Sequence, residues 1–153
     1  MSEFKPFDDK LAGLIGALSP ASRRRLAADI AKELRRSQQQ RIKQQKSPDG
    51  RPYQGRKCQP LRAKSGRIKR AMFQKLRTSR YMKATGRNDA AVVEFTSKVQ
   101  RIAQIHQLGL KDQPNPHAQD VQYPERQLLG FSQNDTQLID RLIIKYFNCL
   151  DYG

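Results

Sequence analysis

The side chains that most often carry catalysis or hold a metal are few in this sequence. Its only histidines are His106 and His117, and its two cysteines, Cys58 and Cys149, lie far apart along the chain. Neither histidine has a cysteine, serine or paired carboxylate at a spacing diagnostic of a nucleophile or a metal site. Thr85-Gly86-Arg87 lacks the rest of a phosphate-binding glycine loop. The sequence therefore predicts no enzyme, no catalytic residue, no metal and no cofactor.

The two histidines have structural explanations. His106 lies on an apolar face at helical spacing, where a lone histidine is more often packed or capping than reactive. His117 follows a proline in a polar stretch, and we expect it to be solvated. The isolated thiols are likewise unsuited to a disulfide framework or a zinc knuckle.

The strongest chemical signal is positive charge concentrated in the middle of the chain. The 153 residues hold 30 Lys and Arg against 14 Asp and Glu, a formal charge of +16. Residues 41–87 account for nearly all of this charge, because they contain 16 bases and a single acid, Asp49. The residues expected to face DNA or a partner are Arg62, Lys64, Arg67, Lys69 and Arg70.

This charge has three interpretations. Dense Lys and Arg suit sequence-independent contact with nucleic-acid phosphates. They also suit docking on an acidic protein surface, or a solvated loop that only keeps the protein soluble. Aromatic residues are sparse between the bases, which argues against a platform that stacks single-stranded bases. Charge alone leaves all three interpretations open.

Two helices are predicted at the start of the chain. Apolar spacing predicts a short helix over about residues 11–18, and Ser19 with Pro20 favours the start of a second that runs to about Gln45. Residues 47–50, Ser-Pro-Asp-Gly, predict a turn. Residues 47–71 then predict a mobile basic loop without periodicity. Residues 71–76 fit either a helical turn or the start of a strand.

The second half predicts a hairpin, two helices and one further strand. Residues 81–95 alternate around a Gly/Asn/Asp turn and predict a hairpin. A helix from about Val99 should end at Gly109 in a left-handed cap. Residues 111–122 predict a long loop, and residues 123–130 a short strand. Ser132 or Asn134 should cap a final amphipathic helix whose inward residues include Leu138, Leu142, Ile143 and Phe147.

These elements predict an α+β fold in a single domain over residues 1–153. The economical arrangement is a small antiparallel sheet with the N-terminal helices and the C-terminal amphipathic helix packed on it. The core is modest, so we expect some apolar helix surface to be completed by a neighbouring subunit. No apolar run could span a bilayer, and the first residues do not read as a signal peptide. We expect a soluble protein made in a reducing cytoplasm.

Two linked motifs carry a family resemblance. Residues 102–109 read I-A-Q-I-H-Q-L-G, and after a variable loop residues 123–130 read Y-P-E-R-Q-L-L-G. Together they resemble the phage tail completion and virion morphogenesis family, whose type members come from P2-like and Mu-like phages. Residues 45–53, Q-K-S-P-D-G-R-P-Y, resemble the P-D-G turn of that family, with Tyr53 where Trp is more usual. Residues 71–73, A-M-F, also match a short apolar Met-Phe pair that the family carries between these motifs.

The resemblance implies a structural virion protein and no enzyme. Such a protein completes the tail so that a DNA-filled head joins it stably at the neck. It implies a homo-oligomer ring, with a hexamer the natural match to a tail tube, and leaves six or twelve copies open. The motif positions, expected to be structural or interfacial, are Arg101, His106, Gly109, Tyr123, Arg126 and Gly130.

The implied partners are the tail tube or tail terminator and the neck or connector proteins. Contact with packaged DNA is possible and contact with a membrane is not expected. The implied location is the tail or neck of the virion, reached from the host cytoplasm during assembly. The alternative function is a nonspecific, basic nucleic-acid-binding protein. Arg126 is expected at the edge of a strand, paired with a carboxylate of this subunit or the next.

Overall fold

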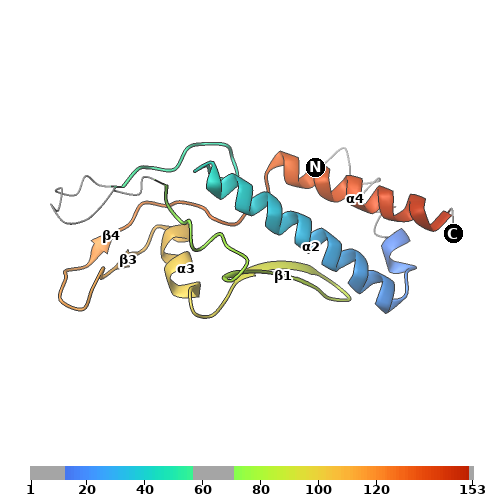
Figure 1. Cartoon of the computed structure of the whole chain (residues 1–153), viewed down its shortest axis with the longest axis horizontal. Helices are drawn as coiled ribbons and strands as arrows, with labels where there is room; N and C mark the ends of the chain where they lie inside the picture. Colours follow the sequence, from blue (N-terminus) through green and yellow to red (C-terminus); the bar gives the residue numbers. More distant parts are fainter. Residues whose placement is uncertain (1–12, 57–70, 152–153) are drawn as a thin grey trace.

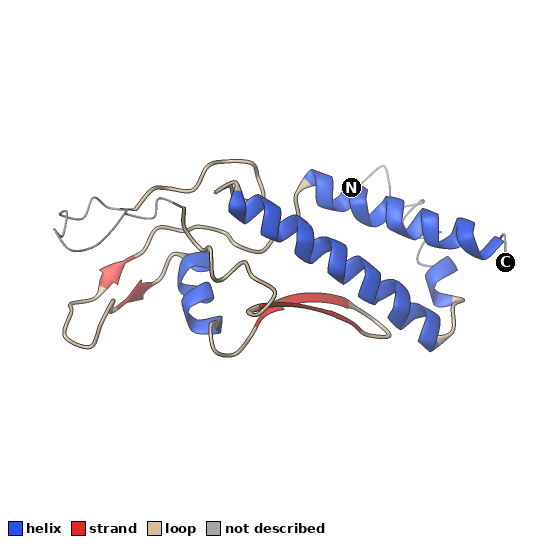
Figure 2. Ribbon diagram, viewed as in Figure 1, coloured by secondary structure: helices blue, strands red, loops and turns tan. Residues whose placement is uncertain are grey.

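The computed structural model describes residues 13–56 and 71–151. It has an α+β fold, as predicted, in which α2 (Pro20–Lys43) is the central element. Figure 1 shows α4 (Gln133–Asp151) along one side of α2 and the β1–β2 hairpin along the other. The secondary structure in Figure 2 places α3 (Gln100–Leu108) and the small β3–β4 pair together toward one end. Of the predicted first helix, the described part contains a helical turn at residues 13–16.

The start and the buried face of α2 follow from its sequence. Ser19 caps the helix, because its hydroxyl accepts a hydrogen bond from the Ser22 N–H at 3.2 Å, and Pro20 occupies the first turn. The apolar stripe at three- and four-residue spacing is buried, as its period predicts. The helix ends at Lys43, two residues before the predicted limit. The buried apolar residues are Leu26, Ile30, Ala31, Leu34 and Ile42.

The predicted hairpin is confirmed as β1 (Met82–Gly86) paired antiparallel with β2 (Ala91–Phe95). It packs closely on α2 through Gly86. A Cβ atom at this glycine would lie 2.2 Å from the backbone nitrogen of Ala28. The absence of a side chain therefore allows the strand to lie directly on the helix backbone.

The C-terminal helix is also confirmed, and Ser132 is its cap. The Ser132 hydroxyl accepts from the Asp135 N–H at 3.1 Å, and the Asp135 carboxylate accepts from the Ser132 N–H at 3.0 Å. This reciprocal pair is a capping box. Ile143 is buried against α2, while Leu142 and Phe147 are half-buried there.

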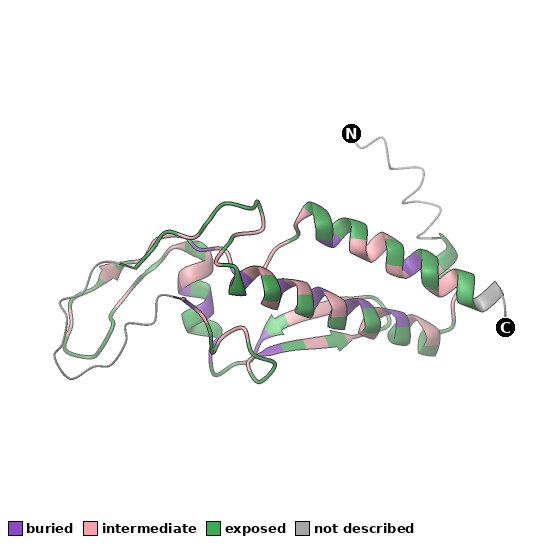
Figure 3. Ribbon diagram, turned by 45° about the horizontal axis from the view of Figure 1, so that its top comes forward, coloured by how far each residue is buried: buried purple, intermediate pink, exposed green. Residues whose placement is uncertain are grey.

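The core consists of two clusters joined by α2. Leu26, Ile30 and Leu34 pack with Ile143 of α4. At the other end of α2, Ile42 lies in a second cluster that draws on the hairpin, α3 and the segment before α4. Figure 3 shows that burial runs along the inner faces of these elements. The second cluster comprises Ile42, Met82, Phe95, Val99, Ala103 and Leu128.

Two local predictions are wrong. Residues 123–130 are extended but pair with no strand; the strand β4 (Val121–Gln122) precedes them and pairs with β3 (Lys111–Asp112). Residues 111–122 were predicted to be a loop throughout, but the two residues at each end of this range pair as β3 and β4 and make it a short hairpin. Residues 71–76 hold no strand; the Arg77 N–H donates to the Phe73 carbonyl at 3.1 Å, which is a single helical turn, one of the two predicted alternatives. Phe73 adopts a positive φ of 66° there, which no periodic pattern predicts.

Candidate functional site

The two sequence motifs form one structural unit. Gln107, near the end of α3, joins the α3 motif to residues 123–130. Its side-chain oxygen accepts hydrogen bonds from the N–H groups of Leu128 at 2.8 Å and Leu129 at 2.9 Å. Its side-chain nitrogen donates to the Leu129 carbonyl at 2.8 Å. One glutamine thus supplies the partners that a neighbouring strand would otherwise provide, and the extended segment needs no sheet.

Arg126 ties this segment to the start of the basic stretch. Its guanidinium donates to the carbonyls of Gln54 at 2.8 Å and Gly55 at 3.2 Å, and its side chain is buried, with 6% of the residue exposed. The predicted strand edge is wrong, because this segment is not a strand, and within the described residues the guanidinium binds carbonyl oxygens and no carboxylate. Pairing with a carboxylate of the next subunit stays a prediction. An interface role for Arg126 stays a prediction.

Four rings pack edge to face beside Arg126. Tyr53 contacts Phe73 with ring centroids 5.7 Å apart, Phe73 contacts His106 at 4.9 Å, and His106 contacts Tyr123 at 5.2 Å. Such edge-to-face pairs stabilise beyond the area they bury. His106 is a packed histidine, as predicted. Burial, together with the charges of Arg126 and Arg56, lowers the pKa of His106 below its usual value.

The remaining motif positions hold the same region together. Arg101 forms an ion pair with Asp112 of β3 at 2.7 Å. Gly109 ends α3 with a φ of 66°, and a Cβ atom there would lie 2.9 Å from the backbone nitrogen of Glu125. A residue with a side chain would push the two motifs apart. Gly130 lies against Pro48, which belongs to the P-D-G turn.

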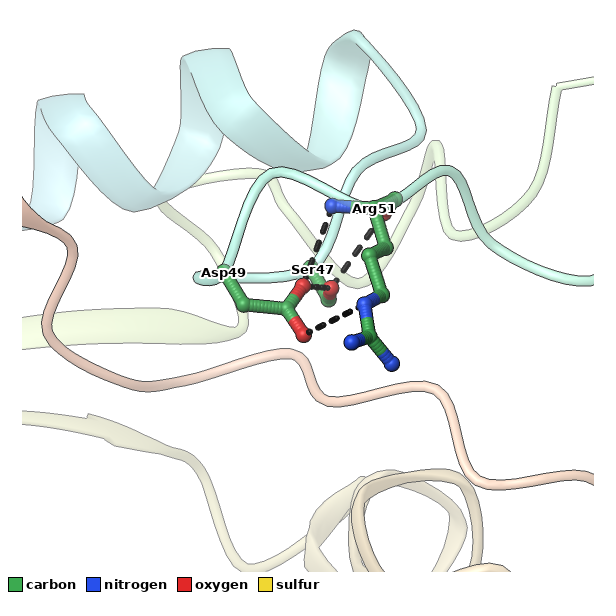
Figure 4. Close-up of polar contacts among 3 residues, drawn as sticks. All are labelled: Ser47, Asp49 and Arg51. Atoms are coloured by element: carbon green, nitrogen blue, oxygen red, sulfur yellow. Dashed lines mark hydrogen bonds and ion pairs between the residues drawn. The ribbon is translucent and has the colours of Figure 1, made fainter.

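The predicted turn at residues 47–50 is confirmed, with Gly50 at a φ of 88°. Figure 4 shows Ser47, Asp49 and Arg51 bound to one another. The Asp49 carboxylate accepts from the Ser47 hydroxyl and from the Arg51 N–H, the latter at 3.0 Å. These hydrogen bonds, the Ser47 bond foremost, lower the pKa of Asp49. The turn is therefore built by its own side chains and presents a fixed surface for Gly130.

A partly buried polar network fixes the end of the extended segment to α2. Arg41 donates to the carbonyls of Leu128 and Lys46, and the Tyr53 hydroxyl donates to the Gln127 carbonyl at 2.7 Å. Burial raises the pKa of the Tyr53 hydroxyl, so it stays a donor. The P-D-G region, α2 and the second motif are thus locked in one arrangement.

The same network continues to α4 through Gln38. This side chain accepts from the Gly130 N–H at 3.3 Å and donates to Asp135 at 3.2 Å. The Asp135 carboxylate, 1% exposed, also accepts from the Ser37 hydroxyl. Each interaction joins residues about 90 or more positions apart in sequence. The capping box therefore does more than start α4, because it fixes that helix to α2.

A groove of about 880 Å³ opens beside the row of rings; we call it the aromatic groove. Its walls come from the turns after residue 70, α3, β4 and the start of the second motif. Three of the motif positions line it: His106, Tyr123 and Arg126. Other residues that line it are Arg56, Phe73, Lys75, Leu76, Ile102 and Val121. The groove has the size and the mainly apolar wall of a binding site.

The structure brings the motif positions together but does not test the basic candidates. Arg62, Lys64, Arg67, Lys69 and Arg70 lie outside the described residues, as does most of the predicted basic loop. His117 is exposed, as predicted. Within residues 13–56 and 71–151, no group of three or more His, Cys, Asp or Glu is placed to hold a metal. In those ranges, no helix is both long and apolar enough to span a membrane.

Sequence reasoning did not single out Gln107, Gln38 or Asp135. Asp135 had a detectable signal, because an acid three residues after Ser132 is the capping-box pattern. Gln107 also had one, because it belongs to the first motif, although it was not among the candidate positions. Gln38 had none, since a glutamine that binds distant backbone looks like any solvated glutamine in a sequence.

Comparison with known proteins supports the family resemblance that the two motifs carry. A model described as the phage virion morphogenesis family matches residues 2–148. The tail completion protein S of Escherichia phage P2 is 47% identical over 147 residues, which cover 95% of this chain and 98% of that protein. No solved structure matches the chain.

Proposed function

Because this chain belongs to the phage virion morphogenesis family, we propose that it is a structural virion protein that completes the phage tail. The observation that carries the proposal is the 47% identity to a tail completion protein along nearly the whole of both chains. The geometry agrees with a structural role, since the motif residues act by holding segments together. We propose that the protein is not an enzyme.

We further propose that the protein acts at the neck end of the tail as a homo-oligomer ring. A hexamer matches the symmetry of a tail tube. The described part of the chain leaves several large apolar side chains in solvent, among them Phe131 at 72% and Leu108 at 56% exposure. Exposed apolar side chains of this size suit contacts with further subunits or with other tail and neck proteins.

The basic residues between Arg51 and Arg70 are proposed to face DNA or a partner during joining. Their charge and the absence of acids among residues 57–70 support this. Replacing Arg62, Lys64, Arg67, Lys69 and Arg70 with Gln should preserve the fold and reduce head-tail joining. Normal joining by that variant would contradict the role and favour a solvated loop.

Tail completion is tested by a phage that lacks the protein. Lysates of this phage should contain DNA-filled heads and separate tails, visible by negative-stain microscopy, with few joined particles. Heads without DNA would contradict the proposal, because the defect would then precede joining. The nucleic-acid-binding alternative is tested separately with duplex DNA. If about six to ten phosphates were contacted, affinity should fall roughly 10³–10⁵-fold between 50 and 200 mM salt.

A further inference from the structure

The aromatic groove combines rings with positive charge. Lys75 and Arg126 line it, and none of its described lining residues is an aspartate or glutamate. The Arg126 hydrogen bonds in the described chain go to neutral carbonyls, so they leave its charge unbalanced. Phe73 lines the groove from a backbone with φ of 66°, a costly conformation for a bulky residue and one that clusters at functional sites. An occupant with aromatic rings and carboxylates would complement these features.

The first nine residues of the chain have this complementary composition. Residues 1–9 contain three acids and two phenylalanines around a single base, Lys5, in a chain whose formal charge is +16. The complementary residues are Glu3, Phe4, Phe7, Asp8 and Asp9.

A chain cannot place these residues in its own groove. Ile15 and Leu18 pack with the cluster at the N-terminal end of α2, whereas Gln45, beyond its other end, binds the backbone of Met72 in the groove wall. The 24 residues of α2 span about 36 Å. Even Glu3, ten residues before Gly13, reaches at most about 36 Å from it when fully extended, and the groove wall lies beyond the far end of α2. Figure 1 shows that the turn before α2 and the region of α3 lie toward opposite ends of α2.

We propose that residues 1–9 of one copy dock in the aromatic groove of the next copy, with phenylalanines against its rings and carboxylates beside Lys75 and Arg126. The contact between subunits is heterologous, because it joins different surfaces of the two copies. Heterologous contacts close into a ring when the rotation between neighbouring subunits is a whole-number fraction of 360°. The inference rests on the proposed function, since it supplies the contact for the ring on the tail.

Disulfide trapping on tails tests this contact. Cys58 and Cys149 are first replaced by serine. One full-length protein then receives Lys5→Cys and a second receives Gln74→Cys, an exposed position on the groove wall. The two are mixed, added to tails that lack the protein, oxidised and separated on a non-reducing gel. We expect a dimer band that contains both proteins, and a ladder of higher bands when one chain carries both substitutions.

Gln137→Cys on α4 is the matched control, because Gln137 is exposed and lies outside the groove. Paired with Lys5→Cys, it should give no band. Lys75→Glu in the Gln74→Cys protein should lower the trapped fraction about two- to fivefold, and Asp8→Lys in the Lys5→Cys protein should restore it.

The outcomes separate this contact from the proposed function. Joined particles without the Lys5–Gln74 band would overturn the contact and leave tail completion in place. A Gln74 band with another tail or neck protein would also overturn it, in favour of a different occupant.

Discussion

Replacement of Gln107 by alanine should destabilise the protein strongly, although the residue contributes little to any apolar cluster. The change removes three hydrogen bonds of 2.8–2.9 Å and leaves the N–H groups of Leu128 and Leu129 without their acceptor. A net loss of about 1 kcal/mol per bond, with a further penalty where a buried donor is left unpaired, gives roughly 2–4 kcal/mol. That is a large share of the stability of a domain of this size, which is about 5–15 kcal/mol.

Urea unfolding measures this loss as a shift of the midpoint at an unchanged slope. Gln104→Ala is the matched control, because Gln104 is an exposed glutamine on the same helix and should change stability by less than about 0.5 kcal/mol. If the two variants unfolded at the same urea concentration, the central place of Gln107 in joining the motifs would be refuted. The Gln107 variant should also lose more head-tail joining activity than the Gln104 control at temperatures near the thermal unfolding midpoint of the Gln107 variant.

Three further predictions follow from packing and charge. Gly86→Ala should force β1 off α2 and cost about 1–3 kcal/mol in urea unfolding, whereas Gly55→Ala, with nothing within 4 Å of its Cβ, should cost little. Leu142→Asp should unfold the protein by placing a charge in the α2–α4 cluster, while Ile144→Asp, at a 44% exposed position, should fold with a normal circular dichroism spectrum. Because the pKa of His106 is lowered in the folded state, the unfolded chain binds the proton more readily, so the free energy of unfolding should decrease as pH falls below about 6.5. His106→Gln should remove that part of the decrease, and equal pH slopes for variant and wild type would contradict this assignment.

The elements with local signals were predictable from the sequence. The start of α2 depends on Ser19 and Pro20, and the end of α3 on Gly109, all of which act within a few residues. The hairpin and α4 likewise show their periods directly. In each case the pattern that predicts the element is also the interaction that stabilises it.

The extended segment at residues 123–130 shows what the sequence could not reveal. Its apolar residues resemble a strand, but Gln107 and Arg41 satisfy its backbone from distant parts of the chain. Side-chain hydrogen bonds to remote backbone leave no periodicity. For the same reason the carbonyl partners of Arg126 within the chain were not predicted, although the motif correctly indicated which positions come together.

Order of addition tests the central claim, that this protein completes tails, most directly. Tails and DNA-filled heads are purified from a phage that lacks the protein, and the purified protein is incubated with one of them before the other is added. The account predicts that tails treated with the protein and then freed of its excess join untreated heads to give infectious particles. If only treated heads became competent, the protein would act on the head and the account would be contradicted.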